Sequence, residues 1–139
     1  MKIKKILVPI DGSKNSFRGL DKAISLARQC QATITGLYVV PLPPPRTDYQ
    51  IKDIEKYFLK SAAKFMAQAK KRSAKNGILF RDKVVYGDEG PKIVSYAKSK
   101  KFDLIVIGSR GLGGIKELFL GSTSNYVLHK ASMPVLIVK

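Results

Sequence analysis

The stretch "FDLIVIGSRGLGGIKELFLGSTSNY", residues 102–126, runs from an apolar segment through a glycine-rich loop into a helical pattern. Its opening residues read as a buried β-strand, and the part that follows holds five of the chain's eleven glycines. Glycine weakens local structure, so this density indicates either unusual backbone angles or a close approach of something to the main chain. We therefore predict a strand–loop–helix unit whose loop is built for close contact.

Working outward from this unit, helical patterns separate five segments that read as strands. The predicted strands cover residues 4–10, 33–40, 78–86, 102–108 and 133–139. The predicted helices cover residues 13–30, 51–76, 87–101 and 121–132. The β-branched runs LIVI and VLIV indicate strands buried on both faces, as in parallel sheets covered by helices. Because parallel crossovers are right-handed, we predict an α/β fold. It is a doubly wound five-stranded parallel sheet, order 3-2-1-4-5, with helices on both faces of a single domain, residues 1–139.

Two of these strand ends carry residues suited to ligand binding. The segment VPIDGS, residues 8–13, follows the first strand, and the glycine-rich loop follows the fourth. Ligands of doubly wound sheets bind beyond the carboxyl ends of the strands, where the connections change from one face to the other. In the predicted order the first and fourth strands are neighbours, so we expect both segments to line one crevice.

The glycine loop matches neither of the common phosphate-binding motifs. Gly108 and Gly113 have P-loop spacing, but Gly114 stands where that motif has lysine. The dinucleotide pattern G-x-G-x-x-G fails because Lys116 occupies its third glycine position. A glycine loop that opens a helix still suits anions, because free backbone N–H groups and the helix dipole point at the ligand.

The charge of the chain favours anionic partners. It has 26 basic and 10 acidic residues, a net charge of +16. The predicted helix over residues 51–76 carries both a core-facing stripe and a basic ridge. The core stripe consists of Ile51, Ile54, Phe58, Ala62, Phe65 and Ala69. The lysine ridge consists of Lys52, Lys56, Lys60 and Lys64. This ridge is either an ordinary solvated helix face or a surface for weak, nonspecific polyanion binding.

Composition excludes several other classes of site. A single cysteine, Cys30, rules out an internal disulfide, and its apolar setting predicts a small buried hydrophobic residue. The lone His129 has no neighbouring ligand for a metal. No apolar run reaches the roughly 20 residues of a membrane-spanning helix, and the N-terminal segment reads as a strand instead of a signal peptide. We expect a cytoplasmic protein without membrane contact.

A three-part pattern resembles one known family along the whole chain. Gly108-x2-Gly111-x9-Gly121-Ser122 stands together with LVPIDGS, residues 7–13, and with KASMPVLIVK, residues 130–139. This combination resembles the universal stress protein family. The resemblance implies its branch that binds ATP, ADP or AMP, a regulatory role in the stress response, and a homodimer joined through the C-terminal strand.

The same resemblance implies a set of ligand contacts. Asp11 would contact the ribose, Pro9 would flank the nucleotide, and the Val39 backbone would lie against adenine. Ribose and phosphates would be held by Gly108, Gly111, Gly121, Ser122 and Thr123. The residues allow each role, because a carboxylate can accept two hydrogen bonds from a ribose diol at once. Plain alternatives stand beside them: Asp11 as a turn residue and Ser122 as a helix cap.

Other residues of the glycine loop bear on phosphate charge and on closure of the loop. Arg110 and Lys116 either neutralise phosphate charge or stand as solvated loop cations. The segment GIKELFL, residues 114–120, is predicted to form a short helical turn that closes the loop onto the body.

The residues favour binding over catalysis. The loop's only acid is Glu117, and no paired carboxylates are recognised, although Ser122 or Thr123 could touch an Mg²⁺ ion brought with ATP. We predict a regulatory module in which ATP orders residues 109–120 and changes which partner docks. The alternatives are a slow ATP hydrolase and a nucleic-acid-associated protein, the latter disfavoured because the basic residues lack interleaved aromatics.

Overall fold

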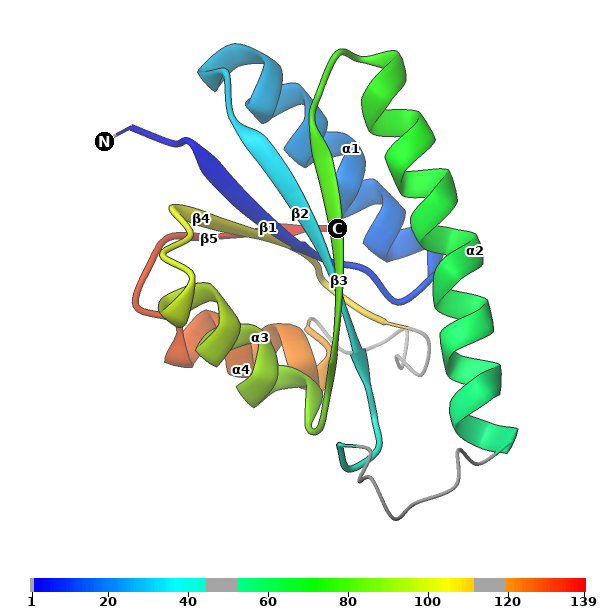
Figure 1. Cartoon of the computed structure of the whole chain (residues 1–139). Helices are drawn as coiled ribbons and strands as arrows, with labels where there is room; N and C mark the ends of the chain where they lie inside the picture. Colours follow the sequence, from blue (N-terminus) through cyan, green and yellow to red (C-terminus); the bar gives the residue numbers. More distant parts are fainter. Residues whose placement is uncertain (1, 45–52, 112–119) are drawn as a thin grey trace.

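The computed structural model describes residues 2–44, 53–111 and 120–139. Within them, one parallel sheet has the order β3-β2-β1-β4-β5, which confirms the predicted topology (Figure 1). The strands are β1 Lys5–Pro9, β2 Thr33–Val40, β3 Phe80–Tyr86, β4 Leu104–Gly108 and β5 Val135–Val138. The helices are α1 Lys14–Cys30, α2 Asp53–Lys75, α3 Glu89–Ser99 and α4 Ser122–Lys130.

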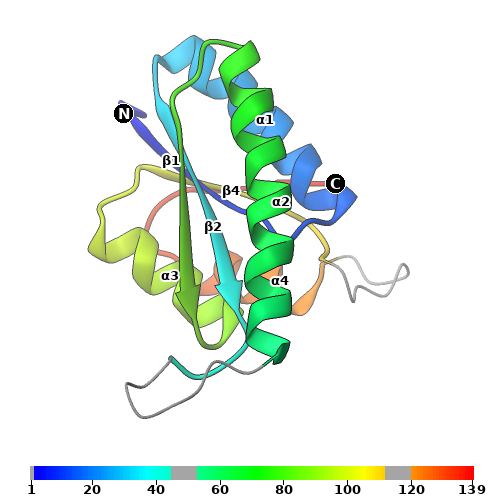
Figure 2. The same cartoon turned by 45° about the vertical axis from the view of Figure 1, so that its right-hand side comes forward.

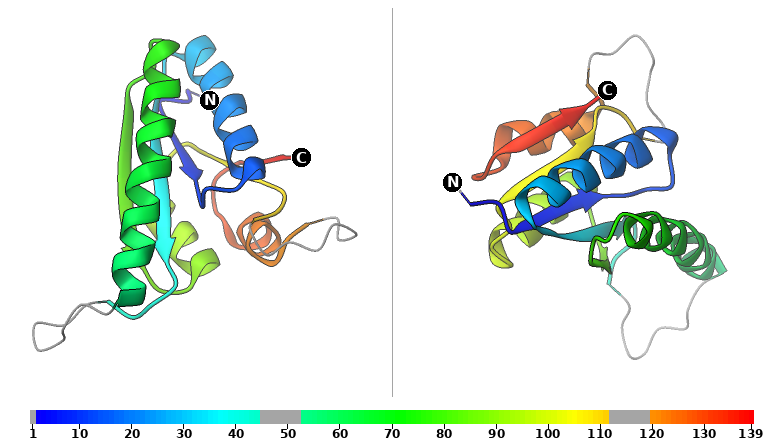
Figure 3. Two further views of the ribbon diagram at one scale, coloured as in Figure 1. Left: turned by 90° about the vertical axis from the view of Figure 1, so that its right-hand side faces the viewer. Right: turned by 90° about the horizontal axis from the view of Figure 1, so that it is seen from above.

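Helices cover both faces of the sheet because alternate strand residues point to opposite sides. In β1, Ile6 and Val8 belong to the core beneath α1 and α2, whereas Leu7 belongs to the core beneath α3 and α4. All three side chains are fully buried. Figure 3 shows α1 and α2 running together along one side of the sheet. The apolar runs seen in the sequence are therefore strands buried on both faces.

The connection after β1 is shaped by a short polar turn. Ser13 caps α1, as predicted, because its side chain accepts a hydrogen bond from the Ser16 amide at 3.0 Å. Several strands begin one or two residues later than predicted: β3 begins at Phe80 and β4 at Leu104. The lone Cys30 is half-buried against the core under α1 and α2.

The predicted core stripe of the longest helix is wrong at its start. Ile54 is 54% exposed, and Glu55 is buried in its place, where it accepts a hydrogen bond from the Tyr86 hydroxyl at 2.9 Å. Figure 2 shows the reason, since the first turn of α2 reaches past the ends of β2 and β3 and has no sheet to cover. Further along, Ala62 and Ala69 are buried as predicted.

Parts of the lysine ridge and of the glycine loop lie outside the described residues. Lys56, Lys60 and Lys64 are exposed on α2, whereas Lys52 and Ile51 are not described. The predicted helical turn at 114–120 also falls there, except for its last residue. None of the helices in the described parts of the chain is long and apolar enough to span a bilayer.

Candidate functional site

The carboxyl ends of β1 and β4 lie side by side at the point where the sheet changes winding direction. Ile6 pairs with Leu104 and Leu7 with Ile105 in the parallel register. The helix after β1 covers one face and the helix after β4 covers the other, so a crevice opens between the two connections.

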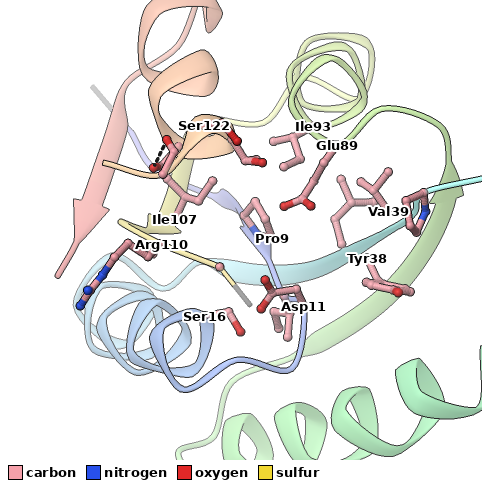
Figure 4. Close-up of a pocket in the computed structure, with 18 of the residues that line it drawn as sticks. Pro9, Asp11, Ser16, Tyr38, Val39, Glu89, Ile93, Ile107, Arg110 and Ser122 are labelled. Atoms are coloured by element: carbon pink, nitrogen blue, oxygen red, sulfur yellow. Dashed lines mark hydrogen bonds between the residues drawn. The ribbon is translucent and has the colours of Figure 1, made fainter. Parts of the chain in front are cut away.

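This crevice is a cleft of about 550 Å³. That volume lies within the usual range for small-molecule sites, about 300–1,000 Å³. All nine residues predicted from the sequence line it: Pro9, Asp11, Val39, Gly108, Arg110, Gly111, Gly121, Ser122 and Thr123. Figure 4 shows how side chains from separate elements converge on the space in front of Pro9. The structure thus gathers the predicted residues in one place, and their contacts with a ligand stay a prediction.

Asp11 has a turn role and also faces the cleft. Its Oδ1 accepts a hydrogen bond from the Ser13 amide at 2.9 Å, which holds the turn before α1. Its Oδ2 lies on the side of the glycine loop, 2.7 Å from where a Cβ on Gly111 would stand. The two interpretations of Asp11 are therefore compatible, since one carboxylate oxygen serves the turn and the other faces the loop.

The start of the glycine loop is anchored by Asn15, a residue that the sequence did not single out. The buried Asn15 side chain accepts a hydrogen bond from the Arg110 amide at 2.6 Å. A Cβ on Gly108 would lie 2.5 Å from Asn15 Oδ1 and 2.8 Å from its backbone oxygen. Glycine is therefore required at position 108 by the approach of α1, independently of any ligand.

The N-terminus of α4 opens onto the far end of the cleft. Its cap is Gly121, not Ser122, so the predicted serine cap is wrong. Ser122 is instead the first helical residue. The Gly121 amide donates a hydrogen bond to the Ser109 carbonyl at 2.7 Å, so the helix cap lies at Gly121, one residue before the predicted position. A glycine cap has no side chain to accept from the first-turn amides, which leaves this helix end suited to an anion.

A second carboxylate, Glu89, faces the cleft and was not predicted as a site residue. It is the first residue of α3, where an acidic side chain suits the helix N-terminus. Glu89 is exposed as a whole residue, but its carboxyl group lies over the cleft. Desolvation there raises the pKa of Glu89 and the nearby charge of Asp11 raises it further, while a hydrogen bond from Thr123 opposes both. The expectation that the chain has no paired carboxylates is therefore wrong for the folded protein.

The other end of the cleft is apolar and suits a planar base. Val39 is 6% exposed there, beside Tyr38, whose ring packs edge-on against Phe65 with centroids 5.2 Å apart. Phe58 of α2 completes this wall. The cleft therefore runs from an apolar end, past two carboxylates, to a helix N-terminus.

Two charged features bear on how phosphates would be held. Figure 4 shows the Arg110 side chain pointing away from Glu89 and Val39, toward the outer edge of the cleft. Among the residues that the structure describes, no cluster of three or more His, Cys, Asp or Glu side chains could hold a metal ion. Ser122 and Thr123, which carry hydroxyl groups, line the cleft, and Mg²⁺ commonly binds through one or two protein groups plus substrate phosphates.

Comparison with known proteins matches this architecture. The model of the universal stress protein family matches residues 2–139. Universal stress protein YxiE of Bacillus subtilis is 34% identical, with 97% of this chain and 98% of that protein covered. Universal stress protein MJ0531 of Methanocaldococcus jannaschii is 30% identical, with 98% and 82% covered.

Solved structures agree with these relatives. Universal stress protein UspA from Lactobacillus plantarum superposes with a TM-score of 0.87 at 28% identity, covering 100% of this chain and 99% of that one. A universal stress protein in complex with cAMP has a TM-score of 0.82 at 25% identity, with 100% and 99% covered. The fold, the strand-end segments and the matched length agree, and the chain belongs to the universal stress protein family.

Proposed function

We propose that the cleft binds an adenine nucleotide, with the base at the Val39 end and the phosphates at the N-terminus of α4. The observation that carries this proposal is the order of groups along the cleft. Along the cleft lie first an apolar wall, then a carboxylate beside the strand-end turn, and then a helix start without a side-chain cap. This order matches the base, the ribose and the phosphates of a nucleotide. A universal stress protein of the same fold is in complex with cAMP, which supports an adenine ligand.

The phosphate end fits ATP, ADP or AMP. The first-turn amides of α4 and the hydroxyls of Ser122 and Thr123 offer donors to phosphate oxygens. An Mg²⁺ ion carried by the phosphates would be held by the same two hydroxyls and would neutralise part of the phosphate charge. The protein acts by binding in this proposal, as a nucleotide-dependent regulatory module of the stress response.

Isothermal titration calorimetry with ATP, ADP and AMP, each with and without Mg²⁺, tests the proposal. We expect saturable one-site binding by the wild-type chain and a large loss of affinity in Gly121→Val. At this position the nearest atom to an added Cβ is the Ser109 carbonyl oxygen at 3.4 Å, an ordinary van der Waals contact, so a Cβ there meets no clash with the protein. An unchanged unfolding transition in Gly121→Val makes the loss specific, and absence of heat with every nucleotide rejects the proposal.

We also propose that two copies pair through β5, which is an edge strand of the sheet. Leu136 on this strand is 37% exposed, and an uncovered apolar edge is a template for a second strand.

A second candidate function is weak polyanion binding along α2. Lys56, Lys60 and Lys64 are exposed at four-residue spacing, and the net charge of +16 favours such contacts. Gel shifts over a salt series test it: retention of a nucleic-acid complex above physiological salt supports a real site, and loss below it indicates nonspecific attraction.

A further inference from the structure

The middle of the cleft is lined by two carboxylates that come from opposite sides. Asp11 follows β1, and Glu89 begins α3. Figure 4 shows both carboxyl groups directed into the same part of the cleft, near Pro9. The chain between them forms two helices, α1 and α2, and two strands, β2 and β3, so only the fold brings them together.

The two carboxylates make this part of the cleft negative, and their charges act on the groups around them. Burial and then the Asp11 charge raise the pKa of Glu89. Burial raises the pKa of Tyr38 as well, and the charges of Asp11 and Glu89 add to that rise.

Glu89 is held in this position by the opposite wall. The Thr123 side chain, one residue into α4, hydrogen-bonds to its carboxyl group. The residue next to Glu89, Gly90, lies against Tyr126 of α4 so closely that an added Cβ would stand 2.8 Å from the ring. The start of α3 is thus seated tightly against α4, which fixes where the Glu89 side chain can reach.

This arrangement separates two chemical requirements along the cleft. The start of α4 favours negative charge, because its amides and dipole point outward. The two carboxylates accept hydrogen bonds and repel negative charge. A bound molecule must therefore present hydroxyl or amino groups to the carboxylates and keep its phosphates at the α4 end.

We propose that Glu89, together with Asp11, makes the cleft selective for 5′-nucleotides with a free 2′,3′-diol. Nucleotides esterified at the 3′ oxygen, such as 3′,5′-cyclic nucleotides, place a phosphate against the carboxylate pair and bind more weakly. This inference rests on the proposed adenine-nucleotide function and assigns Glu89 as a specificity-determining residue of that site.

The structural relatives sharpen the inference. A protein of this fold is in complex with cAMP, so the fold itself accepts a cyclic phosphate. Any exclusion of cAMP by this chain must come from its own side chains, and Glu89 is a charged side chain placed to produce it.

Calorimetric titration with AMP, 3′-deoxy-AMP and cAMP tests the inference in the wild-type chain, in Glu89→Gln and in Asp88→Asn. Glu89→Gln keeps the size and hydrogen-bonding capacity of the side chain and removes its charge. Asp88→Asn removes the same charge from the neighbouring, exposed N-cap of α3, which does not line the cleft and makes no side-chain capping bond. We expect the wild-type chain to prefer AMP over 3′-deoxy-AMP, and both over cAMP.

The ratio of AMP to cAMP affinity carries the result. It should fall by about tenfold in Glu89→Gln, the scale expected for one like charge near the phosphate, and stay unchanged in Asp88→Asn. If AMP binds all three proteins and Glu89→Gln leaves the ratio unchanged, or if Asp88→Asn changes it equally, the inference is wrong and the proposed function stands. If no adenine nucleotide binds the wild-type chain, the proposed function fails and the inference fails with it.

Discussion

A Cβ on Gly111 would lie 2.7 Å from Oδ2 of Asp11. Real Cβ atoms essentially never approach another atom that closely, so a side chain at residue 111 would displace either the Asp11 carboxylate or the loop after β4. The contact links the two strand-end segments that the sequence placed at one crevice, and it sets the width of the cleft at the ribose position of the proposed ligand.

Gly111→Ala should therefore weaken nucleotide binding more than it weakens the fold. The added methyl must displace either the loop or the Asp11 carboxylate, which is tied to the Ser13 amide. We expect at least about a tenfold loss of ATP affinity by calorimetry, because a small misplacement of positioning groups is costly.

Gly77→Ala is the matched control for that variant. Gly77 lies after α2 with a φ of 72° and has no neighbouring atom within 4 Å of an added Cβ. Alanine there costs about 1 kcal/mol of stability through backbone strain and should leave ATP affinity unchanged. Equal affinity losses in the two variants would mean that the Gly111 effect is a general loss of stability.

Gly108→Ala should destabilise the protein whether or not nucleotide is present. The new methyl would collide with Asn15, whose backbone is fixed in the first turn of α1. Overpacking of this kind costs about 1–3 kcal/mol. Urea unfolding should show a lower midpoint with the same slope, and an unchanged midpoint would show that α1 moves aside without cost.

Glu89→Gln should stabilise the nucleotide-free protein at neutral pH. The pKa of Glu89 is raised in the folded state, so the folded protein binds this proton more tightly than the unfolded chain does. Stability is then lost as pH rises from the ordinary glutamate pKa through the raised one. Asp11 and Tyr38 face the same space, and Thr123 opposes the shift through its hydrogen bond.

The size of that effect is modest because Glu89 still contacts water. We expect Glu89→Gln to gain less than about 1 kcal/mol at pH 7 and almost nothing below the ordinary glutamate pKa. Thermal unfolding of both proteins across this pH range measures the difference. A stability difference between the two proteins that does not change with pH would show that folding does not disfavour the charged form of Glu89.

Much of the fold could be predicted because it depends on local patterns. Continuous apolar strands, alternating helices and right-handed crossovers indicate a doubly wound parallel sheet. The order β3-β2-β1-β4-β5 is one of the common orders of that class. That order places the ends of β1 and β4 together, so residues near 11 and 108 were expected to share a crevice. Their grouping followed from topology and required no knowledge of side-chain contacts.

The features that were missed depend on contacts between distant segments. Glu89 is an ordinary acidic residue at a helix start until α3 is packed against α4. Asn15 is an ordinary residue of the first turn of α1 until β4 approaches it. Ile54 fits a helical core stripe, but periodicity does not reveal that the sheet ends before the helix does.

The proposed pairing through β5 predicts a dimer in solution. Sedimentation at tens of micromolar protein should give twice the chain mass of 15.4 kDa. Leu136→Lys adds charge to the exposed edge and should shift the population toward monomer. Leu79→Lys is the control, because it changes a leucine outside that strand that is more exposed, 55% against 37%. A wild-type chain that sediments as a monomer contradicts the pairing.

The most direct measurement of the central claim is a ¹H–¹⁵N NMR titration of the labelled chain with ATP and Mg²⁺. Binding in the cleft predicts the largest amide shifts at Asp11, Val39, Gly108, Gly111, Gly121, Ser122 and Thr123. The exposed lysines of α2, Lys56, Lys60 and Lys64, should change little. Shifts concentrated on those lysines, or no shifts at saturating ATP, would contradict nucleotide binding between the ends of β1 and β4.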